Sequence, residues 1–368
     1  MAIYSFFSFK IITLITALFG ILCLGESSNF SGSFVFGDGL FDAGNNNFIA
    51  TLRKSDFYPN GIDFGGPTGR FTNGKTLVDI LGQELGYNHF TPPYLSPLTN
   101  GPGVLEGVNY ASGGAGILNE TGKIFVGRIN MDAQIDNFES TRQNIISSIG
   151  LTATMQLFKK ALFFTSIGSN DLLHNYLIPS ILSTAYNDLV PPQEFVATLM
   201  SKFSLQLTRL HNLGARKIVV LNVGPIGCTP NQRDTNPNIL LDKCVVFPNW
   251  LAQLFNTQLK SLITELTTTL EGSKLVYADF YNVMKDIIDN YSKYGFENSD
   301  SSCCYVAGRF GGLIPCGLKS KLCLERSKYV YWDPYNPSQA ANDIIAKSLL
   351  DGDTNIISPI NVRQLFQS

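Results

Sequence analysis

Short apolar runs alternate along the chain with stretches in which apolar residues recur at helical spacing. Runs rich in β-branched and aromatic residues predict buried strands at 33–36, 162–165, 217–223 and 274–280. Recurrence at helical spacing predicts helices at 76–85, 195–214, 250–270 and 338–350. This alternation is typical of an α/β domain with a mainly parallel sheet. Because no repeat, charge block or low-complexity linker interrupts it, the pattern predicts a single domain over residues 26–368.

The N-terminal residues 1–25 have the composition of a processing segment. Lys10 precedes an uncharged run over 11–24 that is too short to span a bilayer comfortably, and small and polar residues follow it at once. Cys23 and Gly25 supply the small residues that a signal peptidase requires before its cleavage site. We therefore expect a signal peptide over 1–25, with a signal anchor as the alternative. No later stretch is apolar for long enough to be a membrane helix, so we expect no transmembrane span in the mature chain.

Composition narrows the class of protein further. The 27 Lys and Arg residues nearly balance the 29 Asp and Glu residues, which gives a formal net charge of −2. The 44% of hydrophobic residues excludes the disordered class, which has low hydrophobicity and high net charge. A nearly neutral chain offers no electrostatic reason to expect a nucleic-acid partner. Three histidines, at His89, His174 and His211, are few for an enzyme of this size.

Six cysteines remain after the predicted signal peptide is removed with Cys23, namely Cys228, Cys244, Cys303, Cys304, Cys316 and Cys323. An even number in a secreted chain predicts disulfides, but six cysteines allow 15 pairings and the sequence does not choose among them. Zinc is the alternative; since the spacings lack paired C-x-x-C knuckles and no histidine lies nearby, we expect no metal. Three sequons predict N-glycosylation, at Asn29, Asn119 and Asn290.

Four unusual loops lie next to the predicted elements, at 36–40, 111–116, 168–171 and 332–337. The first and third follow buried strands, the second follows a short extended run, and the fourth precedes the last helix. In open parallel sheets, ligands bind at the carboxyl ends of the strands. We therefore expect these loops to form the functional site.

The loops belong to sequence blocks that together cover essentially the whole mature chain. The blocks are Gly37-Asp38-x-Leu40-x-Asp42-x-Gly44-Asn45-Asn46-Asn47, Pro67-Thr68-Gly69-Arg70-Phe71-x-Asn73-Gly74, Gly107-Val108-Asn109-Tyr110-Ala111-Ser112-Gly113-Gly114, Gly168-Ser169-Asn170-Asp171, Asn222-x-Gly224-Pro225-x-Gly227-Cys228-x-Pro230, Cys303-Cys304 and Asp333-Pro334-Tyr335. In this order they resemble the plant GDSL esterase/lipase family of the SGNH hydrolase superfamily. The resemblance implies a flavodoxin-like three-layer α/β/α sandwich. It also implies ester hydrolysis through an acyl-enzyme, with no cofactor.

The resemblance implies a catalytic serine in a Gly-Asp-Ser-Leu block and a histidine base in an Asp-x-x-His block, oriented by the aspartate. This sequence departs at both positions: Gly39 stands at the nucleophile position and Asn336 at the base position, while Asp333 is retained. Glycine has no side chain to attack a carbonyl, and an asparagine amide does not titrate near neutral pH. Ser-His chemistry needs both groups as a unit, since losing either one in a well-studied serine protease costs about 10⁶ in turnover.

The resemblance implies that the oxyanion half of the site is retained. Carried over by position, its donors are the N–H groups of Gly39 and Gly113 and the side-chain amide of Asn170. We therefore expect a secreted protein that binds a small acyl-ester or carboxylate ligand without turning it over. A protein partner in the secretory pathway is a further expectation. The expected location is the apoplast or cell wall, with the vacuole or an ER body as alternatives on the same pathway.

Several of these residues also have simpler interpretations. Glycine at Gly39 would follow if the strand-to-helix turn needs its backbone freedom, and Asp333 could cap the last helix or hold the Asn336 amide. The alternative function is a working ester hydrolase or acyltransferase with a relocated nucleophile. One candidate is Ser112, a spare hydroxyl beside the oxyanion glycine that lacks an evident base. A second group that could serve catalysis is His174, because Asp171-Leu172-Leu173-His174 has Asp-x-x-His spacing, but we expect it to be a surface or packing histidine on the far side of the site.

Overall fold

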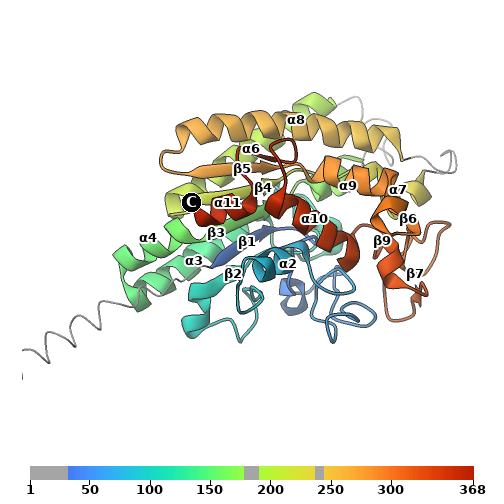
Figure 1. Cartoon of the computed structure of the whole chain (residues 1–368), viewed down its shortest axis with the longest axis horizontal. Coiled ribbons are helices and arrows are strands. Elements are labelled where there is room, and N and C mark those ends of the chain that lie inside the picture. The colour runs from blue at the N-terminus through green and yellow to red at the C-terminus, as the bar shows by residue number, and fades with distance from the viewer. Residues whose placement is uncertain (1–31, 178–189, 237–243) are drawn as a thin grey trace, which may run out of the picture. The chain divides into compact units, whose positions relative to one another are not determined.

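Five parallel strands and one antiparallel edge strand form the central sheet of the computed structural model (Figure 1). The structure describes residues 32–177, 190–236 and 244–368, so the predicted signal peptide and Asn29 lie outside it. Within the described residues the strand order is β10-β5-β4-β3-β1-β2. These strands are β1 (Ser33–Gly37), β2 (Gly107–Asn109), β3 (Leu162–Ser166), β4 (Lys217–Leu221), β5 (Lys274–Ala278) and β10 (Ile357–Ser358).

Helices cover both faces of this sheet (Figure 1). On one face lie α3 (Met131–Ile149), α4 (Leu151–Lys160), α6 (Pro192–Leu213) and α8 (Val246–Thr269). On the other face lie α2 (Leu77–Glu84), α9 (Phe280–Asp289), α10 (Gln339–Asp351) and α11 (Val362–Gln367). The expected three-layer α/β/α sandwich is therefore confirmed.

Smaller elements connect these layers. Two-stranded sheets pair β6 (Asn298–Ser302) with β9 (Tyr329–Tyr331) and β7 (Cys304–Tyr305) with β8 (Lys321–Leu322). Short helical segments are α7 (Pro230–Thr235), η1 (Asn45–Phe48), η2 (Gly101–Glu106), η3 (Lys123–Phe125), η4 (Asp171–Leu177), η5 (Ile226–Cys228), η6 (Tyr291–Tyr294) and η7 (Arg326–Lys328). Among the described residues, no helix is both long enough and apolar enough to cross a membrane.

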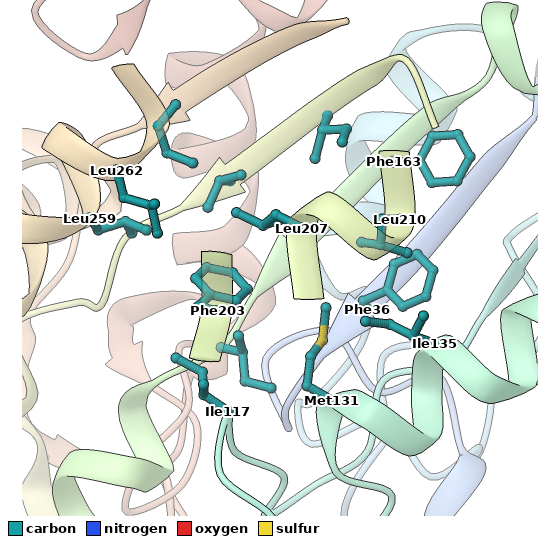
Figure 2. Packing of buried hydrophobic residues seen from close by; sticks show 14 of the residues in the cluster. Phe36, Ile117, Met131, Ile135, Phe163, Phe203, Leu207, Leu210, Leu259 and Leu262 are labelled. Atoms are coloured by element: carbon teal, nitrogen blue, oxygen red, sulfur yellow. The ribbon is translucent and has the colours of Figure 1, made fainter. Parts of the chain in front are cut away.

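The side chains of successive strand residues point to opposite faces of the sheet, and each face is covered by helices. Both sets of side chains are therefore buried, which explains why the strands are continuous apolar runs. Phe34 and Phe36 of β1 belong to the core under α3 and α6, whereas Val35 belongs to the core under α2 and α10. In the first of these cores, Phe36 and Phe163 from the sheet pack with side chains of three helices (Figure 2). The buried helix residues labelled there include Met131, Ile135, Phe203, Leu207, Leu210, Leu259 and Leu262.

The strands and helices expected from the sequence are confirmed, with shifts of a few residues at their ends. Thr76 caps α2, Gly214 ends α6 in a left-handed conformation and Ser338 caps α10, as their residue types favour. Phe280 was expected to end a strand, but it begins α9, because Asp279 caps that helix. The helices α3, α4 and α9 were not expected from the sequence pattern.

The strand order explains where the site forms. The order β2-β1-β3-β4-β5 is the flavodoxin-like order 2-1-3-4-5, in which the chain reverses direction across the sheet between β1 and β3. The loops after these two strands diverge there and leave a crevice at the carboxyl ends of the strands. The expected loops at 36–40 and 168–171 follow β1 and β3 and flank this point.

Three disulfides use all six cysteines, and they pair as Cys228–Cys244, Cys303–Cys323 and Cys304–Cys316. The disulfide sulfurs of Cys303, Cys304 and Cys316 belong to a small buried cluster with Trp332. The N–H of Cys304 also donates to the Trp332 carbonyl at 2.7 Å. These contacts fix the chain immediately before Asp333, so the disulfide-bonded β7–β8 pair positions the segment that carries Asn336.

Candidate functional site

The site begins at the tight turn that follows β1. Gly37 ends that strand with φ +149°, and a Cβ there would lie 2.3 Å from the Ser166 carbonyl oxygen of β3, so glycine is required. The close approach lets the Asp38 N–H donate to the same carbonyl at 3.1 Å. The buried side chain of Asp38 therefore lies at the β1/β3 switch point and lines a pocket.

Gly39 lies in the same turn but does not need to be glycine. Its backbone is outside the left-handed region. A Cβ on Gly39 would meet the Phe71 ring at 3.6 Å and Asn336 Oδ1 at 3.7 Å, which are ordinary van der Waals contacts. Backbone freedom therefore does not account for the glycine. Positions 39 and 336, at which the resemblance implies a serine and a histidine, lie next to each other in the folded chain.

Asn336 is held in place by Asp333. Its Nδ2 donates to both carboxylate oxygens of Asp333, at 2.8 and 3.0 Å, and its backbone N–H donates to Oδ1 at 2.7 Å. Burial raises the pKa of the Asp333 carboxyl, although the Tyr335 N–H and the Arg53 charge act to lower it. Of the two simpler interpretations of Asp333, holding the amide is confirmed. Capping the last helix is wrong, because Ser338 caps α10.

Asn170 follows β3, and its side-chain amide is engaged within the protein. The Nδ2 atom donates to the Ala115 carbonyl at 2.9 Å and to Asp38 Oδ2 at 3.2 Å. Burial raises the pKa of the Asp38 carboxyl to about 7, although the Leu40 N–H and the Arg53 charge lower it. A ligand oxygen that binds Asn170 Nδ2 would have to replace one of these two acceptors.

Gly113 is also engaged, because its N–H donates to Asp42 Oδ2 at 2.9 Å. The other oxygen of Asp42 accepts bonds from the Gly44 and Asn45 N–H groups, at 2.7 and 2.8 Å. Burial raises the pKa of the Asp42 carboxyl to about 6, against the lowering effect of these backbone donors. Of the three expected oxyanion donors, the Gly39 N–H alone has no partner among the described residues. The oxyanion roles stay predictions.

A pocket opens to solvent beside Gly39 and Asn336. The space in which the centre of a water-sized molecule fits is about 80 Å³, several times the ~10–15 Å³ that one water needs. Part of its wall is polar, formed by Asp38, Arg53, Ser169, Asn170 and Asn336. The rest is mainly apolar, including Leu40, Leu173, Ile226, Phe280 and Met284. No histidine, lysine or cysteine among the described residues lines it.

Arg53 is the pocket residue that sequence reasoning missed. Its guanidinium carbon lies 4.9 Å from the Tyr335 ring centroid, 5.1 Å from that of Phe125 and 5.5 Å from that of Phe71. No motif or spacing marks this arginine. The nearest signal is the asparagine run before it, because Asn46 Nδ2 donates to the Arg53 carbonyl at 2.7 Å and so holds the loop.

His174 is a packing histidine, but it does not lie on the far side of the site. Its ring packs against the rings of Phe125 and Tyr335, with centroids 5.0 and 5.9 Å away. Burial and, to a smaller extent, the charge of Arg53 lower its pKa to about 3, so the ring is neutral near pH 7. Neither ring nitrogen has a hydrogen-bond partner among the described residues.

Ser112 is fully buried and its hydroxyl is committed to the protein. Its Oγ donates to Asn46 Oδ1 at 2.6 Å and accepts a bond from the Ile129 N–H at 2.9 Å. Because Asn46 Nδ2 also donates to the Gly113 carbonyl, Ser112 and Asn46 together shape the loop around Gly113. This hydroxyl does not line the pocket.

Two of the predicted glycosylation sites lie on the surface of the described structure. Asn119 and Asn290 are exposed, which glycosylation requires, and their modification stays a prediction. Within residues 32–177, 190–236 and 244–368, no group of three or more His, Cys, Asp or Glu side chains could hold a metal ion. The described residues around Gly39 present polar groups and an apolar surface to the pocket, but no paired hydroxyl and imidazole.

The sequence matches known proteins over nearly its whole length. Residues 34–349 match the family model described as GDSL-like Lipase/Acylhydrolase. GDSL esterase/lipase At4g16230 of Arabidopsis thaliana is 56% identical over 356 residues, which cover 97% of this chain and 96% of that protein. Two further Arabidopsis thaliana proteins, GDSL esterase/lipase At2g23540 and GDSL esterase/lipase At3g50400, are 48% and 47% identical. The matches cover 92% and 93% of this chain and 89% and 92% of those proteins.

Proposed function

Because the chain belongs to the GDSL-like lipase/acylhydrolase family, we propose that it binds an acyl-ester or carboxylate ligand in the pocket beside Gly39 and that it hydrolyses esters extremely slowly or not at all. The observation that carries this proposal is the proximity of positions 39 and 336, since a Cβ on Gly39 would lie 3.7 Å from Asn336 Oδ1. Ester hydrolysis is the plausible activity for the family, but Gly39 has no nucleophile and Asn336 is not a base near neutral pH. Binding can persist where turnover is lost.

The remaining pocket chemistry supports acyl binding. The Gly39 N–H has no partner among the described residues and can donate to a ligand oxygen. Leu173, Ile226, Phe280 and Met284 offer apolar surface to a chain attached to that oxygen. A ligand with one polar end and one aliphatic end matches this division of the pocket.

We further propose that residues 1–25 are removed as a signal peptide and that 26–368 is a single secreted, glycosylated domain. The three disulfides support this proposal, since such bonds form and persist in oxidising compartments. Within the secretory pathway, the extracellular space is the destination that we propose, and a protein partner there is a further part of the hypothesis.

The test is an activity assay on the glycosylated chain. The purified protein is treated with a fluorophosphonate probe and assayed with short p-nitrophenyl esters, beside a heat-denatured sample and the Gly39→Ala variant. We expect the three samples to show the same background labelling and turnover. Clear turnover by the wild type would overturn the proposal. Mass spectrometry of the labelled residue would then identify a relocated nucleophile.

A further inference from the structure

Arg53 is a buried cation that lacks a counter-ion in direct contact. Its exposed fraction is 8%, and the guanidinium makes no hydrogen bond or salt bridge to any of the described residues. Its Nε is fully buried and unpartnered. Arg70 provides the contrast, because that buried guanidinium donates to both oxygens of Asp79, at 2.7 and 2.8 Å. Burying a guanidinium without such a partner is unfavourable, so an anion bound in the pocket would be stabilised beside Arg53.

The nearest carboxylates do not supply that anion. Asp38 and Asp333 are close enough for the Arg53 charge to act on them, but their oxygens accept bonds from other groups. Asp38 accepts from the Leu40 N–H and from Asn170 Nδ2, and Asp333 is bound by Asn336. Burial also raises the pKa of both carboxyls, which weakens each of them as a counter-ion at acidic pH.

Three aromatic rings hold the guanidinium at the pocket. The rings of Phe71, Phe125 and Tyr335 lie within 5.5 Å of its carbon. The Phe71 ring also borders the position of a Cβ on Gly39, at 3.6 Å. Arg53 and Gly39 both line the pocket and share this ring as a neighbour, so a ligand oxygen at Gly39 lies on the same side of the fold as the unpaired charge.

We propose that Arg53 binds the carboxylate of an ionised aliphatic acid and that the pocket selects free acids over neutral esters. The aliphatic chain lies along Leu173, Ile226, Phe280 and Met284. This inference rests on the proposed function, because it names the ligand class of the same pocket.

The preference follows from the chemistry of the guanidinium. Its planar fork of N–H donors matches the two oxygens of a carboxylate, and charge-assisted bonds are roughly twice as strong as neutral ones. A neutral ester offers a single uncharged carbonyl acceptor and leaves the buried cation uncompensated. The site therefore gains most from a ligand that carries the charge of a hydrolysis product rather than that of a substrate.

The first measurement uses the wild-type chain alone. Isothermal titration calorimetry compares octanoate with octanamide, which has the same length and a neutral head of nearly the same shape. We expect octanoate to bind at least about tenfold more tightly, because a charged bond to arginine replaces a neutral one. Equal affinities, or tighter binding of octanamide, would overturn the inference. This comparison does not depend on the folding of any variant.

The second measurement locates the anion. Arg53→Met removes the charge and keeps an apolar stem, while Lys123→Met removes one exposed positive charge that does not line the pocket. We expect Arg53→Met to lower octanoate affinity at least about tenfold and to lower octanamide affinity by much less, because octanamide loses only a neutral hydrogen bond. Lys123→Met should bind both ligands as the wild type does, and Arg53→Lys should recover part of the preference. If Arg53→Met keeps the octanoate preference, Arg53 is not the anchor.

The outcomes separate this inference from the proposed function. If octanamide binds as well as octanoate, the pocket still binds acyl ligands, and only the selection by Arg53 is lost. If the wild type hydrolyses p-nitrophenyl octanoate, the proposed lack of turnover is wrong, while the octanoate preference is still read from calorimetry. If neither ligand binds at millimolar concentration, both proposals are overturned.

Discussion

The side-chain oxygen Oδ1 of Asn336 lies 3.7 Å from the point that a Cβ on Gly39 would occupy. Asn336 turns this oxygen toward Gly39 because its Nδ2 is bound to both oxygens of Asp333. The side-chain amide of Asn336 thus lies between the Asp333 carboxylate and the turn after β1 that contains Gly39. An imidazole at position 336 would have one nitrogen toward Asp333 and the other toward residue 39. Positions 39 and 336 therefore lie side by side at the site, although glycine carries no hydroxyl and asparagine carries no imidazole.

Restoring both groups should therefore restore chemistry. We predict that Gly39→Ser combined with Asn336→His gains ester hydrolysis of at least about 100-fold over the wild type, while neither single variant gains any, because serine and base act as a unit. The new Cβ at position 39 meets only ordinary contacts, so the serine should be accommodated. The measurement is the rate with p-nitrophenyl butyrate.

The matched control for this experiment is Gly39→Ala combined with Asn336→His, which has the same Cβ and base but no hydroxyl. It should remain at the wild-type background. If the serine variant is folded but no faster than this control, the oxyanion donors have lost the geometry that catalysis needs. The bonds from Gly113 to Asp42 and from Asn170 to Asp38 would be the first places to look.

The free energy of unfolding should decrease as the pH rises from mildly acidic to mildly alkaline values. Burial raises the pKa of Asp38 from 3.8 to about 7, so in this interval the native chain holds a proton that the unfolded chain has released. The stabilisation from this proton is complete below pH ~4 and is lost as the pH rises through about 7. Between about pH 5 and 8 the loss is about 3 kcal/mol for this group.

The variant Asp38→Asn isolates that contribution. Its free energy of unfolding, from urea titrations at the two pH values, should change by about 3 kcal/mol less than that of the wild type. Asp42 and Asp171, whose pKa values burial also raises to about 6, remain in both proteins and cancel from the comparison. Identical pH dependence in the variant and the wild type would mean that Asp38 stays ionised in the native state.

The ion pair between Arg70 and Asp79 should be structural. The side chains are 6% and 2% exposed, and Asp79 also closes the capping box of α2 with Thr76. Arg70→Met leaves a buried carboxylate unpaired and should lower the free energy of unfolding by about 3–5 kcal/mol. Adding Asp79→Asn removes that charge while keeping an acceptor for the cap, so the double variant should be more stable than Arg70→Met alone. Additive losses would contradict a coupled pair.

The disulfide between Cys304 and Cys316 should stabilise the segment before Asp333. The two cysteines are 12 residues apart, and closing a loop of this size contributes about 3 kcal/mol in the chain-entropy account. Replacing both with alanine should lower the urea midpoint by a corresponding amount without leaving a free thiol. The double alanine variant of Cys228 and Cys244 serves as a comparison elsewhere in the fold. An unchanged midpoint would show that packing around Trp332 suffices.

Local sequence patterns predicted an element best where a run of apolar residues forms the element or a single residue type ends it. The apolar run that forms β1 and the glycine at Gly214 depend on neighbours in the sequence, so their effects can be read without the fold. α3 escaped prediction because its buried positions are mixed with polar ones, including Gln134, which is buried and bonded to Gly37 at the end of β1. A buried polar residue that hydrogen-bonds to a distant backbone group does not contribute to the hydrophobic periodicity by which a helix is recognised.

For the candidate site, too, some features follow from the sequence and others depend on the fold. The identity of the residues at 39 and 336 is a property of the sequence, and so is the absence of a hydroxyl and an imidazole at these two positions. The sequence could not show whether the Gly113 N–H is free to bind a ligand, because its acceptor, Asp42, lies 71 positions away in the chain. Arg53 is the clearest case, since nothing near it in sequence distinguishes it from a solvated loop arginine.

By itself the sequence determined the α/β class, the loops at the strand ends and the glycine and asparagine at positions 39 and 336, because these depend on residue type and short-range spacing. Only the tertiary structure decided the disulfide pairing, the engagement of two of the three expected oxyanion donors and the aromatic enclosure of Arg53. Phe71, Phe125 and Tyr335 come from separate segments, and packing of the layers brings them to one guanidinium. Contacts of this kind depend on how the whole chain buries its apolar faces, which local spacing does not encode.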